Sequence, residues 1–178
     1  MKKRLLFVAV AVLVTATLAT AQRNASQQAV ERIQKEVRHE ILMLPYFDVF
    51  DNITFKVEGY DVTLSGQVIR PTLKTDAERV VKAIEGVEKV DNQIEVLPVS
   101  PNDNRIRIRA FRAIYGYSAL QRYALPVIKP IRIIVKNGHI TLEGVVDSEA
   151  DKNLVNMRAR GVSGAFSVTN NLVVSAGK

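Results

Sequence analysis

An internal repeat constrains the fold of this chain more than any other feature. The stretch GYDVTLSGQV at residues 59–68 returns as NGHITLEGVV at residues 137–146. An ungapped offset of 78 residues extends the match well beyond these stretches, and it pairs Gly66 with Gly144, Gly86 with Gly164 and Asn92 with Asn170. Spread-out identities at one constant offset indicate two copies of one structural unit. Domains this small are only marginally stable alone, so we expect the copies to pack on each other.

Each copy has the same order of hydrophobic patterns. Alternating apolar residues on both sides of a Gly-containing turn predict a β-hairpin, a helical period follows, and a short alternating segment closes the unit. One more helical stretch precedes each hairpin. The sequence therefore predicts an α+β protein of two tandem small αββαβ domains, each a three-stranded sheet with two helices packed on one face.

The helix before each hairpin is expected to bury one apolar stripe. Under the offset of 78, these stripes are Val30, Ile33, Val37 and Ile41 in the first copy and Ile108, Phe111, Tyr115 and Ala119 in the second. The recurrent glycines are expected to be structural: Gly66 and Gly144 at a bend or bulge, and Gly86 and Gly164 at helix C-termini.

The chain begins with a basic head, an apolar run and an Ala-Thr-Ala sequence, as a secretory signal peptide does. We expect a signal peptide at 1–21 with cleavage near Ala21; an uncleaved N-terminal anchor is the alternative. The boundaries that follow are a first domain at 22–97, a linker at 98–103 and a second domain at 104–178. The absence of cysteine excludes disulfides and a lipid-modified N-terminus, so the expected location is the periplasm or outside the cell.

The hairpin motif V-x-G-x-x-V-T-L-S-G-x-V, followed about 20 residues later by G-V-x-x-V-x-N-x-I, resembles the BON (bacterial OsmY and nodulation) domain. The resemblance covers nearly the whole chain after residue 21, although the second copy has Ala165 where the motif expects Val. It implies a non-enzymatic envelope protein with a role in envelope or osmotic stress, and it implies binding to phospholipid.

Residues for catalysis or metal binding are scarce. His39 and His139 fall in different copies, without the spacing of a zinc site. The carboxylates Asp147, Glu149 and Asp151 precede or begin a helix, where negative charge is favoured by the helix dipole. We expect no catalytic residue, no metal, no cofactor and no small-molecule substrate.

The charge differs between the two halves. Residues 22–98 hold 10 basic and 13 acidic residues, whereas residues 99–178 hold 12 basic and 5 acidic residues. In the second half, Arg105, Arg109 and Arg112 lie four and three residues apart, so they share one face of a helix. Behind them the same helix is expected to carry an apolar strip, consisting of Ile106, Ala110, Ala113, Ile114 and Tyr117.

Two interpretations of this helix remain open. It could pack on the acidic first domain, with Arg105, Arg107 and Arg109 meeting residues such as Glu31, Glu36 and Glu40. Alternatively, it could bind an anionic phospholipid membrane, with Arg105, Arg109 and Arg112 at the phosphates and Tyr117 and Tyr123 at the headgroup level. A protein-interaction or chaperone-like module of the envelope is the alternative function. Nucleic acid is not expected, because the signal peptide directs the chain away from it.

Overall fold

The computed structural model describes residues 27–175. The predicted signal peptide therefore lies outside the described residues. Between residues 27 and 175, no helix is both long enough and apolar enough to cross a membrane.

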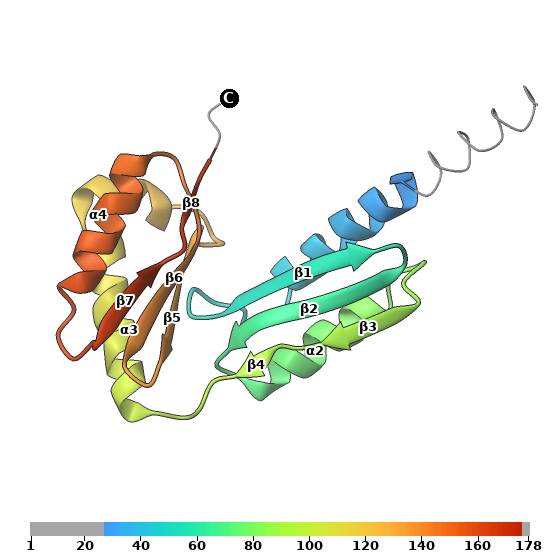
Figure 1. Ribbon diagram of the computed structural model, residues 1–178, viewed down its shortest axis with the longest axis horizontal. Helices are drawn as coiled ribbons and strands as arrows, with labels where there is room; N and C mark the ends of the chain where they lie inside the picture. The colour runs from blue at the N-terminus through green and yellow to red at the C-terminus, as the bar shows by residue number, and fades with distance from the viewer. Residues whose placement is uncertain (1–26, 176–178) are drawn as a thin grey trace, which may run out of the picture.

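Both copies fold into the predicted order of helix, strand, strand, helix and strand (Figure 1). In the first domain, residues 27–42 are helical and are followed by β1 (Asn52–Glu58), β2 (Asp61–Val68), α2 (Pro71–Lys82), β3 (Lys89–Asn92) and β4 (Glu95–Val96). The second domain consists of α3 (Pro101–Tyr115), the 3-10 helix η1 (Ser118–Ala124), β5 (Ile131–Lys136), β6 (His139–Val146), α4 (Glu149–Arg160), β7 (Ser167–Asn170) and β8 (Val173–Val174).

The central strand of each sheet is the second strand of the hairpin. β2 pairs antiparallel with β1 and parallel with β3 and β4, and β6 pairs in the same way with β5, β7 and β8. The closing strand is thus one strand broken in two. At each break an asparagine, Asn92 or Asn170, accepts from the backbone N–H two residues ahead and donates to a helix carbonyl, that of Lys74 or Lys152. This bridging role accounts for the repeated asparagine.

Gly66 and Gly144 lie inside β2 and β6, so each strand continues through the position where the sequence predicts a bend or bulge. Both have a positive φ, of 112° and 114°. A Cβ atom at either position would collide with a carbonyl oxygen of the neighbouring strand region, that of Asn52 or Pro130. Close approach of two backbones therefore requires glycine.

The glycines after the second helix of each copy are not helix caps. Ala83 caps α2 and Gly161 caps α4 at their C-termini. Gly86 and Gly164 lie further along, in the turn that leads to the closing strand, where both have φ of 91°. The turn, rather than the end of the helix, needs the left-handed conformation.

The core stripe of α3 differs from the prediction. Ile106, Ala110 and Ile114 are fully buried in the core of the second domain, together with Tyr115, whereas Ile108 is 47% exposed. Ile106 lies against the turn at Gly164 as Ile33 lies against the turn at Gly86. The first helices therefore align at an offset of 73, because the connection to the hairpin is five residues longer in the second copy.

The two domains are joined through the segment that precedes β1, which lies beside β5 (Figure 1). The backbone carbonyl of Val49 accepts a hydrogen bond of 2.9 Å from Ile133, and the Val49 side chain is part of the second domain's core. Phe50 packs edge-on against Phe111 of α3. Since Val49 and Phe50 come from the first copy, the second copy completes its core with residues of the first.

Arg132 also contributes to the contact between the two domains, from the face of β5 that no helix covers. Its guanidinium donates to the carbonyl oxygen of Asp48 at 2.8 Å and stacks 4.5 Å from the Phe47 ring centroid. The covalent connection between the domains is short, because β4 ends at Val96 and α3 begins at Pro101. Ser100 caps α3, whose first residue is Pro101, so the helix begins within the segment 98–103 that the sequence predicts as a linker.

Candidate functional site

The exposed side of α3 is basic and carries no acidic residue. Arg105, Arg109 and Arg112 all face solvent, with the exposed side chain of Ile108 between them. Asp103, the one acidic residue of the helix, is buried and accepts from the backbone N–H groups of Asn137 and Gly138. The helix therefore turns its carboxylate inward and its arginines outward.

The basic surface continues onto α4, which packs beside α3. Arg158 donates to the carbonyl oxygen of Ala113 in α3 at 3.0 Å and stacks 4.7 Å from the ring centroid of Tyr117. Tyr117 is 36% exposed, and Arg160 is exposed two residues beyond Arg158. We call the surface made by Arg105, Arg109, Arg112, Arg158 and Arg160 the arginine face.

The same place in the first domain has a different charge. There a groove runs between helix 27–42 and α2, and its lining includes Glu36, Glu40 and Glu85 as well as Arg32 and Lys35. At the offsets that superimpose the cores, Glu36 corresponds to Arg109, Glu40 to Ala113 and Glu85 to Ser163. The surface between the two helices thus carries both acidic and basic side chains in the first domain, whereas its charged side chains in the second domain are all basic.

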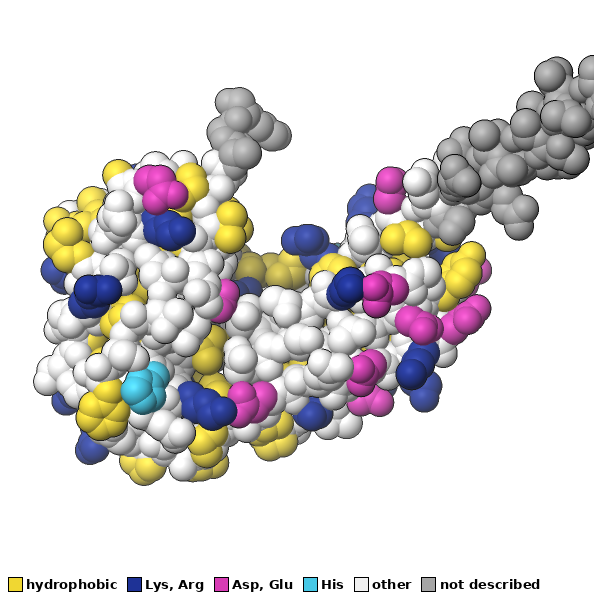
Figure 2. Space-filling model, in the orientation of Figure 1, with side chains coloured by type: hydrophobic (Ala, Val, Ile, Leu, Met, Phe, Trp, Pro, Cys, Tyr) yellow, Lys and Arg dark blue, Asp and Glu magenta, His cyan; other side chains and the backbone are white. Residues whose placement is uncertain are grey.

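Acidic residues are also replaced at the end of the domain where the hairpin turns. Glu58, Asp61, Glu88 and Asp91 of the first domain correspond to Lys136, His139, Phe166 and Thr169 of the second. Figure 2 shows the result on one face of the molecule: acidic side chains gather over the first domain and are sparse on the second. The charge difference between the halves is therefore a difference between corresponding surfaces.

The predicted ion pairs between the domains do not form. Arg105 bonds only to Asn102 of its own helix at 3.4 Å, and Arg109 donates to the carbonyl oxygen of Ser163 at 2.9 Å. Arg107 is buried and donates to the carbonyl oxygen of Val135 in β5. The expected apolar strip is not free either, because Ile106, Ala110 and Ile114 lie in the core.

Of the five residues predicted to contact lipid, the structure exposes four and buries one. Arg105, Arg109, Arg112 and Tyr117 are on the surface, whereas Tyr123 is only 4% exposed. Tyr123 lies in η1, in the longer connection, and its hydroxyl accepts from the backbone N–H of Asp147 at 2.9 Å. It cannot reach a lipid headgroup. The sequence-based prediction of the lipid-binding residues missed Arg158, Arg160 and Phe166. A position-by-position comparison of the copies would have singled out Arg158, opposite Val80, and Phe166, opposite Glu88, but not Arg160, because its counterpart Lys82 is also basic.

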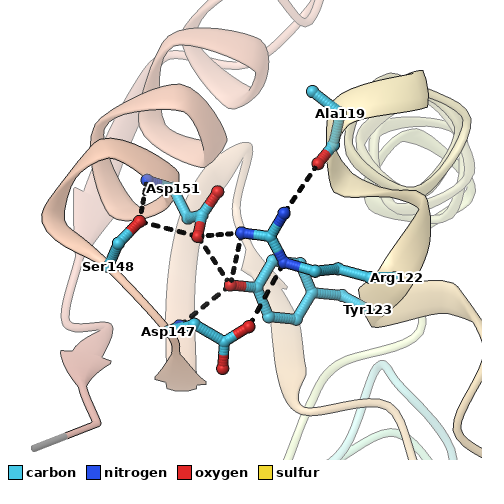
Figure 3. Close-up of polar contacts among 6 residues, drawn as sticks. All are labelled: Ala119, Arg122, Tyr123, Asp147, Ser148 and Asp151. Atoms are coloured by element: carbon cyan, nitrogen blue, oxygen red, sulfur yellow. Dashed lines mark hydrogen bonds and ion pairs between the residues drawn. The ribbon is translucent and has the colours of Figure 1, made fainter. Parts of the chain in front are cut away.

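The carboxylates near the start of α4 belong to a compact polar cluster (Figure 3). One carboxylate oxygen of Asp151 accepts from Arg122, from the Tyr123 hydroxyl at 2.9 Å and from Ser148 Oγ at 2.7 Å. Arg122 also pairs with Asp147 at 3.2 Å. Arg122 and Tyr123 come from η1, so the cluster ties the longer connection to the helix α4.

The protonation states in this cluster suit a structural role. Burial raises the pKa of Asp151, but hydrogen bonds from Ser148, Tyr123 and Arg122 outweigh burial and leave its pKa below the ordinary value. Burial raises the pKa of the Tyr123 phenol, which therefore remains a neutral donor. The side chains of Arg122, Tyr123 and Ser148 all converge on one oxygen of Asp151, an arrangement that fixes η1 against the start of α4.

The histidines are far apart in the structure as in the sequence. His39 lines the groove of the first domain, and His139 begins β6, where its Nδ1 lies 2.7 Å from Ser167 Oγ. Within residues 27–175, no group of three or more His, Cys, Asp or Glu side chains could hold a metal ion. The most distinctive chemistry on the described surface is thus a set of arginines suited to anionic oxygen groups.

Comparison with known proteins identifies the fold. The family model of the BON domain matches residues 29–98 and 118–176, so the match to the second copy begins after α3. No curated protein matches the chain. Two similar solved structures are of CdsD, a structural protein of the type III secretion system of Chlamydia trachomatis. The first is 14% identical, with 80% of this chain and 92% of that chain covered and a TM-score of 0.29. The second structure is the C-terminal domain of CdsD. It is also 14% identical, with 79% of this chain and 96% of that chain covered and a TM-score of 0.28. With two matched segments that span most of its length, the chain belongs to the BON domain family.

Proposed function

We propose that this protein is a non-enzymatic envelope protein that binds anionic phospholipid membranes peripherally through the arginine face of its second domain, with a role in envelope or osmotic stress. One observation carries the proposal: where the first domain has Glu36, Glu40 and Glu85 in a groove between its helices, the second has Arg109, Ala113 and Ser163. Membership of the BON family supports it, since BON domains occur in envelope proteins and bind phospholipid.

The physical basis is attraction between guanidinium groups and lipid phosphates. Arginine presents a planar set of donors that matches phosphate oxygens, and each basic residue near an anionic leaflet contributes about 1 kcal/mol. Five arginines on one surface, with exposed Ile108 among them, are enough for reversible attachment. The attraction weakens with salt, because the Debye length is only about 10 Å at 0.1 M ionic strength.

Binding through the protein-interaction alternative is less well supported. That function would use either the apolar strip of α3 or an open sheet edge as the contact surface. The backbone N–H of Ile133 in the outer strand β5 is already bonded to Val49. Ile106, Ala110 and Ile114 are fully buried in the second domain's own core, so they are not available to a partner.

Vesicle co-sedimentation of the chain without residues 1–21 tests the proposal. We expect binding to vesicles that contain phosphatidylglycerol at low salt, no binding to neutral phosphatidylcholine vesicles, and loss of binding in the triple variant Arg105→Glu, Arg109→Glu and Arg112→Glu. Equal sedimentation with both kinds of vesicle would overturn the proposal.

The first domain supplies a matched control. The variant Arg32→Glu, Lys35→Glu and Arg38→Glu changes three exposed basic residues on helix 27–42, so it alters net charge by the same amount as the triple variant of α3. We expect it to retain binding. If both triple variants lose binding equally, the attraction depends on net charge rather than on the arginine face. Thermal unfolding of each variant verifies that it is folded.

A further inference from the structure

Phe166 is a large aromatic side chain with 77% of its surface exposed. It lies in the turn between α4 and β7, directly before the first residue of β7. Its counterpart in the first domain is Glu88, which follows the equivalent turn. A charged residue is the ordinary occupant of such a position, whereas an exposed phenylalanine gains nothing from contact with water.

The turn that carries Phe166 is held in place at both ends. The Phe166 backbone N–H donates to the carbonyl oxygen of Gly138 at 2.8 Å, and Arg109 donates to the carbonyl oxygen of Ser163 at 2.9 Å. The Phe166 ring lies against Gly138, where any Cβ atom would collide with it, and 5.8 Å from the ring of His139. Glycine at position 138 therefore makes room for an aromatic ring that the rest of the protein leaves uncovered.

The pocket that Phe166 lines is basic and holds no carboxylate. The nearby carboxylate of Asp103 is buried and bonded to the backbone of the hairpin turn. Arg160 lines the same shallow pocket as Phe166, together with Ala165, Ser167 and Val168. Arg109 joins this turn to the arginine face through its bond to Ser163. In the first domain the corresponding turn carries Glu85 and Glu88, and the facing hairpin carries Asp61. All three acidic positions have changed, to Ser163, Phe166 and His139.

We propose that Phe166 inserts into the boundary between headgroups and acyl chains of an anionic bilayer, while Arg109 and Arg160 lie at the level of the phosphates. The inference rests on the proposed function and deepens it, because it adds insertion of an apolar side chain to an attachment that otherwise involves only the membrane surface. An apolar ring beside cationic side chains matches the polarity gradient of a membrane interface, where amphipathic surfaces bury their apolar side. Soluble polyanions offer the arginines phosphate but offer the ring nothing.

The chain has no tryptophan, so a single substitution creates an unambiguous probe of insertion. In Phe166→Trp, we expect the emission to shift to the blue on addition of phosphatidylglycerol vesicles and to be quenched by lipids brominated along the acyl chains. The matched control is Glu88→Trp, at the corresponding position of the first domain, whose emission should not change. Thermal unfolding of both variants verifies that the fold is intact.

A second variant measures how much insertion contributes to affinity. If the Phe166 side chain is buried in the bilayer, its removal loses the free energy of that burial. Phe166→Ala should therefore weaken vesicle binding about tenfold or more. Binding of the same variant to inositol hexakisphosphate, a soluble polyanion, should equal that of the unmodified chain.

The outcomes separate this inference from the proposed function. If Phe166→Trp sediments with phosphatidylglycerol vesicles but its emission stays that of a water-exposed indole, insertion is refuted and peripheral binding stands. If Phe166→Ala binds vesicles as tightly as the unmodified chain, insertion is likewise refuted. If the unmodified chain does not bind these vesicles, the proposed function fails and the insertion fails with it.

Discussion

The backbone carbonyl of Val49 in the first domain accepts a hydrogen bond of 2.9 Å from the backbone N–H of Ile133 in the second. It satisfies an N–H group on the outer strand of a sheet, which would otherwise be open to pairing with another chain. With Val49 also packed into the second core, the two domains are joined by backbone pairing and by apolar burial. Changes at this contact should therefore affect both domains.

Arg132→Ala is expected to weaken the contact between the domains. Arg132 is only 9% exposed, bonds to the Asp48 carbonyl and stacks on Phe47, so its loss removes a charged hydrogen bond and a cation–π contact. We expect the free energy of unfolding to fall by about 2 kcal/mol and the thermal transition, followed by calorimetry, to broaden or split. Arg105→Ala, at an exposed site with one weak bond, is the control and should change stability by less than about 0.5 kcal/mol. An equal effect of the two substitutions would contradict this account.

Asp103→Ala is expected to destabilise the second domain. The buried carboxylate accepts from the N–H groups of Asn137 and Gly138 at 3.0 and 2.8 Å, and its removal leaves the turn of the β5–β6 hairpin without these acceptors. Urea unfolding should show a loss of about 2–3 kcal/mol. Asp103→Asn retains one acceptor oxygen and should lose less. A loss below about 0.5 kcal/mol in Asp103→Ala would show that the turn does not depend on this carboxylate.

Gly144→Ala should be more damaging than Gly59→Ala. Both glycines have positive φ, but a methyl group at position 144 collides with the Pro130 carbonyl, whereas nothing lies near position 59. We expect a loss of about 1 kcal/mol for Gly59→Ala, from the backbone conformation alone, and at least about 2 kcal/mol for Gly144→Ala. Chemical denaturation of the two variants compares them directly, and similar losses would refute the role of the close approach.

The Asp151 cluster should make stability depend on acidic pH. Asp151 has a pKa below its ordinary value of 3.8 in the folded chain, so its ionised form stabilises the fold above about that pH, and the benefit is lost as the pH falls through the lowered pKa. The unmodified chain should be more stable than Asp151→Asn at neutral pH, and the difference should shrink as the pH falls below 3.8. Urea unfolding at a series of pH values measures this, and a constant difference would contradict it.

The hairpins and the order of elements could be predicted because period-two alternation is local and because the repeat shows it twice. The buried face of α3 could not be predicted in this way. An ungapped offset assumes that the connection between the first helix and the hairpin has the same length in both copies, whereas the second copy has five more residues there. The error moved Ile106 and Ile114 from the core to the surface in the prediction. The predicted exposure of the arginines is nevertheless confirmed, because Arg105, Arg109 and Arg112 also lie away from the stripe of α3 that is buried in the structure.

The sequence of β5 indicates that this strand is covered on both faces, as it is by the contact between the domains. β1 alternates between buried and more exposed side chains, whereas five consecutive residues of β5, Ile131 to Val135, are buried. A strand buried on both faces is typically apolar without alternation, and Ile134 in place of Lys56 gives β5 the unbroken apolar run Ile133 to Val135. The covering partner could not be read in the same way, because Phe47 to Phe50 lie in an irregular segment without periodicity.

The completion of the second core by Val49 also limits how the duplicated unit can be reused. The two copies share one fold, yet only the second takes a core residue from its neighbour on the N-terminal side. Excised for expression, residues 99–178 would lack part of their interior and expose the backbone of β5. In the order that the chain has, the second domain's core is therefore complete only when the first domain precedes it.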